Sequence, residues 1–369
     1  MKITDVTVTL FKWENIPLKS YDHAIKSVAG SSDLGLVRIK TDEGIEGHAL
    51  LGLCVHPASL EAPYIIRFLK PILMGQNPLD RERLFQSMSR MRAQVSTLAV
   101  CAVDVALWDL AGKISGLPVH AMMGTFRHKI PVYASSEQHD TVDGYVEQAL
   151  AVKESGLHGY KLHPKQHWRD DIAACQAVRK AVGDDFNLML DSRSAYDLGE
   201  AVKVGRAIEE LGFLWYEDPL PVTDIYNYAK LRESMDIPVM ATEFPAGWLD
   251  DYAPWIMNKA TDMLRGDVMI KGGITSMLKI AHLAEAFAMK LEIHHGGNSM
   301  NDVANLHIQM AIPNTSFMEV LLPHEAWWHG LVEEIQIDSD GFAHAPSKPG
   351  LGYEVDLELV ERQKIAVVS

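Results

Sequence analysis

Cysteine, basic residues and long apolar runs are all scarce in this 369-residue sequence. The three cysteines, Cys54, Cys101 and Cys175, are odd in number and far apart, so no disulfide framework is expected. Only 34 Lys and Arg stand against 49 Asp and Glu, a net charge of −15 that disfavours binding to nucleic acid or anionic membranes. No apolar run approaches the roughly 20 residues that span a bilayer.

A signal peptide is also not evident at the start of the sequence. The first seven residues carry Lys2 and Asp5 and lack an apolar core. The composition, 47% hydrophobic and 22% charged, is typical of a folded domain and not of a disordered chain. We therefore expect a soluble, cytoplasmic globular protein with neither a membrane nor a nucleic-acid partner.

Residues 1–125 have the pattern of an N-terminal α+β domain. β-branched residues alternate over 3–11 and again over 34–40, which predicts two strands. Helical spacing of apolar residues then dominates, most clearly over 99–116, before a Gly-Leu-Pro stop. The polar segment 17–33 is long enough to be a mobile loop, and an ordered surface loop is the alternative.

Residues 126–320 repeat a strand-and-helix pattern. Helical stretches such as 197–211 and 274–288 separate short apolar segments, which implies right-handed βαβ units closing into a (β/α)8-type barrel. Residues 321–369 no longer repeat the unit, and we expect them to return to the N-terminal domain. The eight predicted strands are 130–135, 159–163, 187–191, 214–217, 238–243, 267–271, 291–295 and 316–320.

Three acids recur at a constant spacing near the ends of consecutive predicted strands. Asp191, Glu217 and Glu243 are 26 residues apart, so one βα unit separates each pair. The carboxyl ends of barrel strands share one face, so we expect these side chains to project into one cavity. Three clustered carboxylates require a counter-cation, and oxygen-only ligation suits Mg²⁺. Three unrelated surface acids are the alternative explanation.

Polar residues on other predicted strands flank these acids. Lys161 and His163 alternate along one strand and therefore point the same way. Asp267 and His294 come from two later strands, and an Asp that holds a histidine ring commonly fixes its tautomer. Taken singly, each histidine could be an ordinary buried core residue. Taken together, the two histidines, the lysine and the aspartate resemble two acid/base groups flanking a metal.

This constellation resembles the enolase superfamily and, within it, the mandelate racemase subgroup. Residues 102–113 are similar to the family's helix that enters the barrel. Asp267, Gly272-Gly273 and His294 match the spacing of its Asp–His dyad, and Pro349-Gly350-Leu351-Gly352 matches its closing signature. The resemblance covers nearly the whole chain.

The resemblance implies a fold, a cofactor and a set of functional residues. It implies a modified (β/α)8 barrel with an α+β capping domain that the C-terminal segment completes, and a symmetric homo-oligomer. It also implies Mg²⁺ bound by Asp191, Glu217 and Glu243. Catalysis would fall to Lys161, His163, Asp267 and His294, and Glu319 matches an acid that hydrogen-bonds the substrate carboxylate in relatives.

Two positions depart from the family pattern. His163 stands where many members carry a second Lys, which leaves open whether Lys161 or His163 is the base. Arg193 stands two residues after the first metal ligand, where many relatives have Asn. It would place an extra cation near the substrate or form an ion pair with a neighbouring acid.

The resemblance implies removal of the proton α to a carboxylate. We expect a Mg²⁺-dependent dehydratase of an acid sugar, an aldonate or an aldarate, that forms a 2-keto-3-deoxy acid. Arg193, His163 and a polar lid that includes Tyr21 and His23 support this choice of reaction. The alternatives are a racemase, epimerase or cycloisomerase on a carboxylate substrate, and a metal-binding homologue without catalysis.

Overall fold

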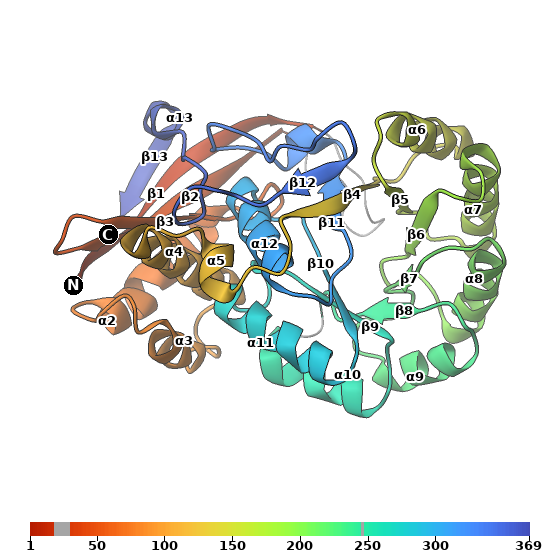
Figure 1. Cartoon of the computed structure of the whole chain (residues 1–369), viewed down its shortest axis with the longest axis horizontal. Helices are drawn as coiled ribbons and strands as arrows, with labels where there is room; N and C mark the ends of the chain where they lie inside the picture. The colour runs from red at the N-terminus through yellow and green to blue at the C-terminus, as the bar shows by residue number, and fades with distance from the viewer. Residues whose placement is uncertain (18–29, 245–246) are drawn as a thin grey trace.

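The computed structural model describes residues 1–17, 30–244 and 247–369. Tyr21 and His23 of the predicted lid lie outside the described residues. Figure 1 shows an antiparallel sheet on one side of the molecule and a ring of parallel strands wrapped by helices on the other. No helix in the described part of the chain has the length and apolar character needed to cross a membrane.

The antiparallel sheet joins the two ends of the chain. Its strand order is β13-β1-β2-β3. Residues 30–33, predicted as part of a loop, instead extend β2, because Ser31 pairs with Glu14 and Asp33 pairs with Lys12 across the ladder. The strands are β1 (Ile3–Ile16), β2 (Gly30–Thr41), β3 (Glu46–Leu51) and β13 (Lys364–Val368).

Helices pack on this sheet, and the longest of them, α4, lies between the sheet and the barrel. Ser96 caps its first turn by accepting a hydrogen bond from the Ala99 amide at 3.3 Å. Gly116 ends it in the left-handed region, with a φ of 69°. The helices are η1 (Ala58–Leu60), α1 (Ala62–Tyr64), η2 (Ile65–Leu69), α2 (Lys70–Leu73), α3 (Arg81–Ser89), α4 (Thr97–Ser115) and α5 (Val119–Met123).

Eight parallel strands form a nearly closed barrel, in the order β10-β9-β8-β7-β6-β5-β4-β11. In the described residues β10 and β11 do not pair, but the Leu291 amide donates to the Asn314 carbonyl at 2.8 Å across the seam. The predicted barrel with its α+β capping domain is confirmed. The strands are β4 (Lys129–Ser135), β5 (Gly159–Leu162), β6 (Asn187–Asp191), β7 (Tyr216–Glu217), β8 (Val239–Ala241), β9 (Met263–Gly266), β10 (Lys290–Ile293) and β11 (Met318–Leu321).

Large side chains fill the barrel interior. Tyr133, Met189, Trp215 and Met240 form a buried cluster inside the ring of strands. The rings of Tyr133 and Trp215 meet edge to face, with centroids 5.7 Å apart. This cluster forms a packed layer inside the barrel, so any ligand site must lie at a mouth of the barrel. The surrounding helices are α6 (Val142–Glu154), α7 (Trp168–Val182), α8 (Leu198–Glu210), α9 (Ile225–Glu233), η3 (Leu249–Tyr252), α10 (Ala253–Met257), α11 (Gly273–Ala286) and α12 (Ser299–Ala311).

The predicted strand at 267–271 is wrong, because β9 ends at Gly266. The Asp267 side chain accepts the amides of Met269 (2.7 Å) and Ile270 (3.0 Å), and this turn ends the strand pairing. The apolar run from Val268 to Ile270 resembles a strand in sequence but leads directly into α11. The correction places Asp267 just beyond the carboxyl end of its strand.

The capping domain is tied to the barrel at the mouth. Asp104 of α4 accepts the amide (2.9 Å) and the hydroxyl (2.7 Å) of Thr275 at the start of α11. Gly273 beside it has a φ of 84°, and a Cβ there would lie 2.4 Å from the Asp104 carboxylate, so only glycine fits. On the other side, Asn298 donates to the carbonyls of Leu50 (3.1 Å) and Gly52 (2.9 Å).

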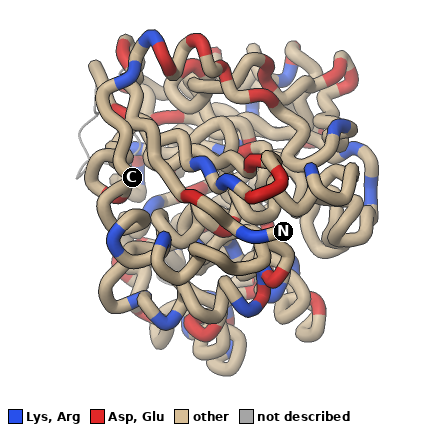
Figure 2. The backbone as a smooth tube through the Cα atoms, turned by 90° about the vertical axis from the view of Figure 1, so that its left-hand side faces the viewer, with Lys and Arg blue, Asp and Glu red and all other residues tan. Residues whose placement is uncertain are grey.

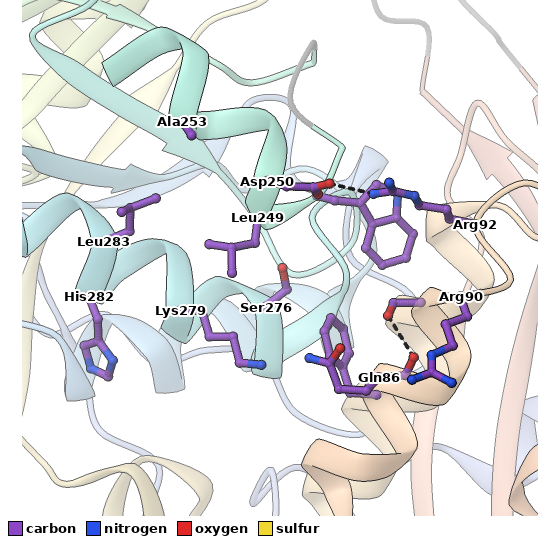
Figure 3. Close-up of a pocket in the computed structure, with 13 residues that line it drawn as sticks. Gln86, Arg90, Arg92, Leu249, Asp250, Ala253, Ser276, Lys279, His282 and Leu283 are labelled. Atoms are coloured by element: carbon purple, nitrogen blue, oxygen red, sulfur yellow. Dashed lines mark hydrogen bonds and ion pairs between the residues drawn. The ribbon is translucent and has the colours of Figure 1, made fainter. Parts of the chain in front are cut away.

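A groove of about 900 Å³ follows the flank of this contact, between α3 and α11. Figure 3 shows the ion pair of Arg92 with Asp250 (2.8 Å) on its rim and Ser276 near its centre. A second ion pair, Lys279 with Glu82, crosses from barrel to cap at 2.5 Å. Charged contacts therefore supplement the buried ones that hold the cap in place.

The C-terminal segment returns to the capping domain. β13 pairs antiparallel with β1, with Val368 opposite Val8. Before it, Gly350 packs against α4 so closely that a Cβ on Gly112 would lie 2.6 Å from its Cα. The remaining elements are η4 (His324–Ala326), β12 (Phe342–His344), which pairs with β4, and α13 (Leu357–Arg362).

Candidate active site

Three buried carboxylates meet at the carboxyl ends of consecutive barrel strands. Asp191 is the last residue of β6, Glu217 is the last residue of β7, and Glu243 lies two residues beyond β8. One oxygen of each lies within 4.8 Å of the others. Within the described residues this is the only such group of potential metal ligands. An all-oxygen donor set on rigid strands fits Mg²⁺.

The electrostatics of the triad also favour a bound cation. Burial raises the pKa of Glu217 to about 7 although Arg265 and Lys161 oppose it, and the charges of Asp191 and Glu243 add to the increase. Asp191 behaves differently: burial raises the pKa of its carboxyl, but the contact with His163 and the charges of Lys161 and Arg193 together hold it well below its usual range. A divalent cation between these oxygens would favour the ionised form of all three.

Lys161 of β5 lies beside the triad. Its Nζ is 2.9 Å from Glu217 Oε2, 2.8 Å from Glu319 Oε1 and 3.7 Å from Asp191 Oδ2. Burial and the nearby Arg265 lower the pKa of Lys161, but the charges of Glu217 and Glu319 outweigh them and raise it well above its usual value. Lys161 is therefore a fixed cation beside the proposed metal ligands.

His163, which follows β5, is held at both ring nitrogens. Its Nδ1 lies 2.6 Å from the Ser136 carbonyl oxygen and its Nε2 lies 2.9 Å from Asp191 Oδ2. The Tyr145 hydroxyl donates to the His163 carbonyl at 3.0 Å. Burial lowers the pKa of His163, although the Asp191 charge opposes this. The ring points at a proposed metal ligand, a contact that strand alternation alone did not reveal.

Asp267 and His294 meet as the sequence predicts. His294 Nδ1 lies 2.5 Å from Asp267 Oδ2, and His294 Nε2 lies 3.6 Å from Glu243 Oε1. Asn305 of α12 bridges the two segments, because it accepts the Val268 amide (3.0 Å) and donates to the His294 carbonyl (3.0 Å). Sequence reasoning missed this asparagine, which has no distinguishing local motif.

His294 is the most accessible of the predicted acid/base groups. Its side chain is 14% exposed, against 1% for Lys161 and 3% for His163. Burial lowers the pKa of His294, but the charge of Glu243 and the hydrogen bond to Asp267 raise it to about 9. A cation bound by Glu243 would oppose this increase and favour the neutral imidazole.

Arg265 of β9 completes the site and was not predicted. Its Nε lies 2.8 Å from Glu217 Oε1, its Nη2 lies 2.5 Å from Glu319 Oε2, and its Nη1 donates to the Ile293 carbonyl at 3.1 Å. A signal was present in the sequence: Arg265 precedes Asp267 by two residues, so a charge falls inside a buried barrel strand.

Glu319 of β11 serves as an acceptor in this arrangement. It binds Arg265 and Lys161 and also accepts the His295 amide at 3.1 Å. Burial raises the pKa of Glu319, but Arg265 and Lys161 together lower it well below its usual value. This disfavours the protonated carboxyl that a hydrogen bond to a substrate carboxylate requires, and that contact stays a prediction.

Arg193 lies at the opening of the site. Its backbone amide donates to Asp191 Oδ1 at 2.9 Å, and its guanidinium carbon is 5.6 Å from the centre of the Phe244 ring. Both residues line a cavity of about 300 Å³ that also contains Asp191 and Glu243. The structure therefore brings Arg193 to the same cavity as two of the proposed metal ligands.

Two family models match the chain. Residues 144–359 match the enolase C-terminal domain-like family, and residues 3–124 match the N-terminal domain of mandelate racemase and muconate lactonizing enzyme. The chain belongs to the mandelate racemase branch of the enolase superfamily. The family resemblance that the sequence motifs indicated is thereby confirmed.

Members of this branch with different reactions are similar to the chain. Arabinonate dehydratase of Saccharolobus solfataricus is 28% identical, over 98% of this chain and 99% of its own. D-galactarolactone cycloisomerase of Agrobacterium fabrum is also 28% identical, over 87% of this chain and 88% of its own. The crystal structure of D-glucarate dehydratase from Agrobacterium tumefaciens, complexed with magnesium, superposes on the chain with a TM-score of 0.90. It is 34% identical in sequence, and the match covers 99% of this chain and 100% of that one.

Proposed function

We propose that this protein is a Mg²⁺-dependent dehydratase of an acid sugar, which removes the proton α to the carboxylate and expels the β-hydroxyl to give a 2-keto-3-deoxy acid. The observation that carries the proposal is the position of His294, held by Asp267 and directed at Glu243 of the carboxylate triad. Dehydratases among the relatives support the same class of reaction.

Asp191, Glu217 and Glu243 would hold Mg²⁺, which when bound supplies a Lewis acid for the substrate carboxylate. Lys161 lies next to these ligands and is kept cationic by Glu217 and Glu319. Its charge would stabilise the negative charge that develops on the substrate carboxylate as the α-proton leaves.

His294 Nε2 would accept the α-proton, while Asp267 keeps the proton on Nδ1 and orients the ring. The ring then carries the transferred proton and returns it to the departing β-hydroxyl, which leaves as water. The electron pair of the broken C–H bond forms the C=C bond of an enol, and the enol becomes the 2-keto acid. No proton is gained or lost overall.

The surroundings of Lys161 and His163, the two predicted acid/base groups other than the Asp267–His294 pair, favour dehydration over racemisation. A racemase or epimerase needs acid/base groups on both faces of the reacting carbon, whereas an elimination needs only one. Lys161 is enclosed between two carboxylates, and both ring nitrogens of His163 contact acceptors. His294 is therefore the proposed acid/base group.

A screen in D₂O tests the proposal. Protein with Mg²⁺ is mixed with a library of aldonic and aldaric acids, and proton NMR follows each mixture. We expect a 2-keto-3-deoxy product. Exchange of the C2 proton with the hydroxyls intact would instead indicate a racemase or epimerase, and conversion of a lactone without loss of water would indicate a cycloisomerase.

The same assay tests the role of His294. We expect His294→Asn to lower turnover by about 10²- to 10⁴-fold, the usual contribution of a general acid/base group. His282→Asn, at an exposed histidine on α11, is the matched control. Full turnover by His294→Asn would refute the proposed role.

A further inference from the structure

The cavity at the mouth of the barrel has an uneven distribution of charge. Asp191 and Glu243 line it at the proposed metal site, and Asp218 adds a carboxyl group whose pKa burial and the neighbouring acids raise well above its usual value. Arg193 is the one cationic side chain along its wall within the described residues. Two other cations of the site, Lys161 and Arg265, are buried behind the carboxylates that they bind, and Lys271, near Asp267 and Glu243, is also fully buried.

The backbone fixes the place of Arg193 in this cavity. Its φ of 48° lies in the left-handed region, and its amide is bound by Asp191 Oδ1. The next residue, Ser194, also has a positive φ of 62° and donates its amide to the Asp218 carbonyl at 2.6 Å. These bonds attach the segment to the metal-ligand strands, and the side chain extends toward Phe244, whose ring is 53% exposed.

We propose that Arg193 selects acid sugars with a second carboxylate, so that the substrate is an aldarate and not an aldonate. The inference rests on the proposed function and concerns the end of the substrate away from the metal ligands. A guanidinium binds a carboxylate through paired, charge-assisted hydrogen bonds, which the neutral terminal alcohol of an aldonate cannot match.

The acids of the cavity strengthen this discrimination. Asp191 and Glu243 repel an approaching anion unless a cation compensates their charge. A Mg²⁺ ion held by the three metal ligands, together with Lys161, would compensate the carboxylate next to the reacting carbon. The second carboxylate of an aldarate depends on Arg193, so this residue decides whether a diacid binds.

Substrate pairs that differ only at the terminal carbon provide the test. Galactarate is compared with galactonate, and glucarate with gluconate, so that the configuration of the central carbons is held constant. We expect the diacid of the preferred pair to have a kcat/KM about 10- to 100-fold higher. Arg193→Asn should reduce this ratio by a similar factor, and Arg193→Lys should retain part of it.

Asparagine is the suitable replacement because it tolerates the left-handed backbone of residue 193. Arg206→Asn, at an exposed arginine on α8, is the matched control and should leave the ratio unchanged. Equal kcat/KM values for both members of each pair, or an unchanged ratio in Arg193→Asn, would overturn the proposal.

A binding measurement separates this inference from the proposed function. Isothermal titration calorimetry reports occupancy of the site without turnover. If no acid sugar is dehydrated, the dehydratase proposal fails. The role of Arg193 is then judged by whether Arg193→Asn weakens the binding of galactarate or glucarate, in the presence of Mg²⁺, more than that of the matching aldonate.

Discussion

At the scale of single residues, the arginine inside the barrel is the least expected feature. Arg265 is fully buried and contacts Glu217 and Glu319, so part of the negative charge at the site is neutralised by the protein itself. Strand ends reveal the metal-ligand triad in the sequence because carboxylates are unusual there. Arg265, the third residue of β9, does not lie at a predicted strand end, because the sequence pattern predicted this strand at 267–271.

Arg265→Met should destabilise the protein by about 3–5 kcal/mol, because it leaves two buried carboxylates without their partner. Urea unfolding monitored by fluorescence measures the change. Arg206→Met on the exposed face of α8 should change the free energy of unfolding by less than about 0.5 kcal/mol. An unchanged urea midpoint for Arg265→Met would contradict the structural role.

His163→Gln should weaken Mg²⁺ binding by about 10- to 100-fold, because the ring holds the Asp191 carboxylate in position. Isothermal titration calorimetry with Mg²⁺ measures the affinity without any substrate. Unchanged Mg²⁺ affinity, together with loss of deuterium exchange at C2, would instead make His163 an acid/base group.

At the scale of secondary structure, α4 connects segments that are remote in the sequence. Asp109 accepts the amides of His48 in β3 (2.8 Å) and of Leu351 near the C-terminus (2.9 Å). Gly350 lies against the same carboxylate, and a Cβ there would approach its Oδ1 to 2.3 Å. The two segments that carry the family resemblance, 102–113 and 349–352, therefore contact each other in the fold.

Asp109→Ala should lower the free energy of unfolding by about 2–4 kcal/mol, because a buried and a partly buried amide lose their acceptor. Thermal and urea unfolding measure the effect. Glu147→Ala, at an exposed acid on α6, is the control and should be nearly neutral. A neutral Asp109→Ala would show that water or relaxation replaces these hydrogen bonds.

Secondary structure was predictable where the spacing of apolar residues in the sequence matched the residues that are buried in the fold. The predicted strand 187–191 coincides with β6, and the predicted helix 197–211 contains α8, with Asp197 as its cap. The failure at 267–271 has a physical cause. Val268 and Met269 are buried in a turn, and an apolar run has the same pattern in a buried turn as in a strand.

At the scale of the whole molecule, the site depends on contacts between segments that are far apart in the sequence, and no local sequence pattern predicts these contacts. Figure 2 shows Lys and Arg interspersed with Asp and Glu along the trace, so the net charge of −15 arises from scattered residues. The triad and the dyad were predictable because barrel topology brings strand ends together. Ser136 and Asn305 were not, since their roles depend on distances between segments across the barrel.

His307 gives the assembled molecule a pH-dependent stability. It joins α12, the capping domain and the C-terminal segment, because its Nδ1 accepts the His120 amide and its Nε2 donates to the Leu351 carbonyl, each at 3.0 Å. Burial lowers the pKa of His307 to about 3. Its contribution is complete above the unfolded pKa of about 6.5 and is lost as the pH falls toward 3.

His307→Gln should therefore lose less stability than the parent between pH 7 and pH 4. We expect the difference to be about 3 kcal/mol, because glutamine can hydrogen-bond but does not titrate in this range. Urea unfolding at both pH values measures it. Equal losses in the two proteins would place the acid sensitivity at other groups.

The pairing of β13 with β1 also has a consequence for synthesis of the protein. Residues 364–368 complete the sheet that residues 3–51 begin, and the whole barrel is encoded between them. At ribosomal rates of about 5–20 residues per second, the edge of β1 waits roughly 15–65 s for its partner. An open strand edge is a template for pairing with other chains. The nascent protein therefore has its greatest need of a chaperone while the barrel is being translated.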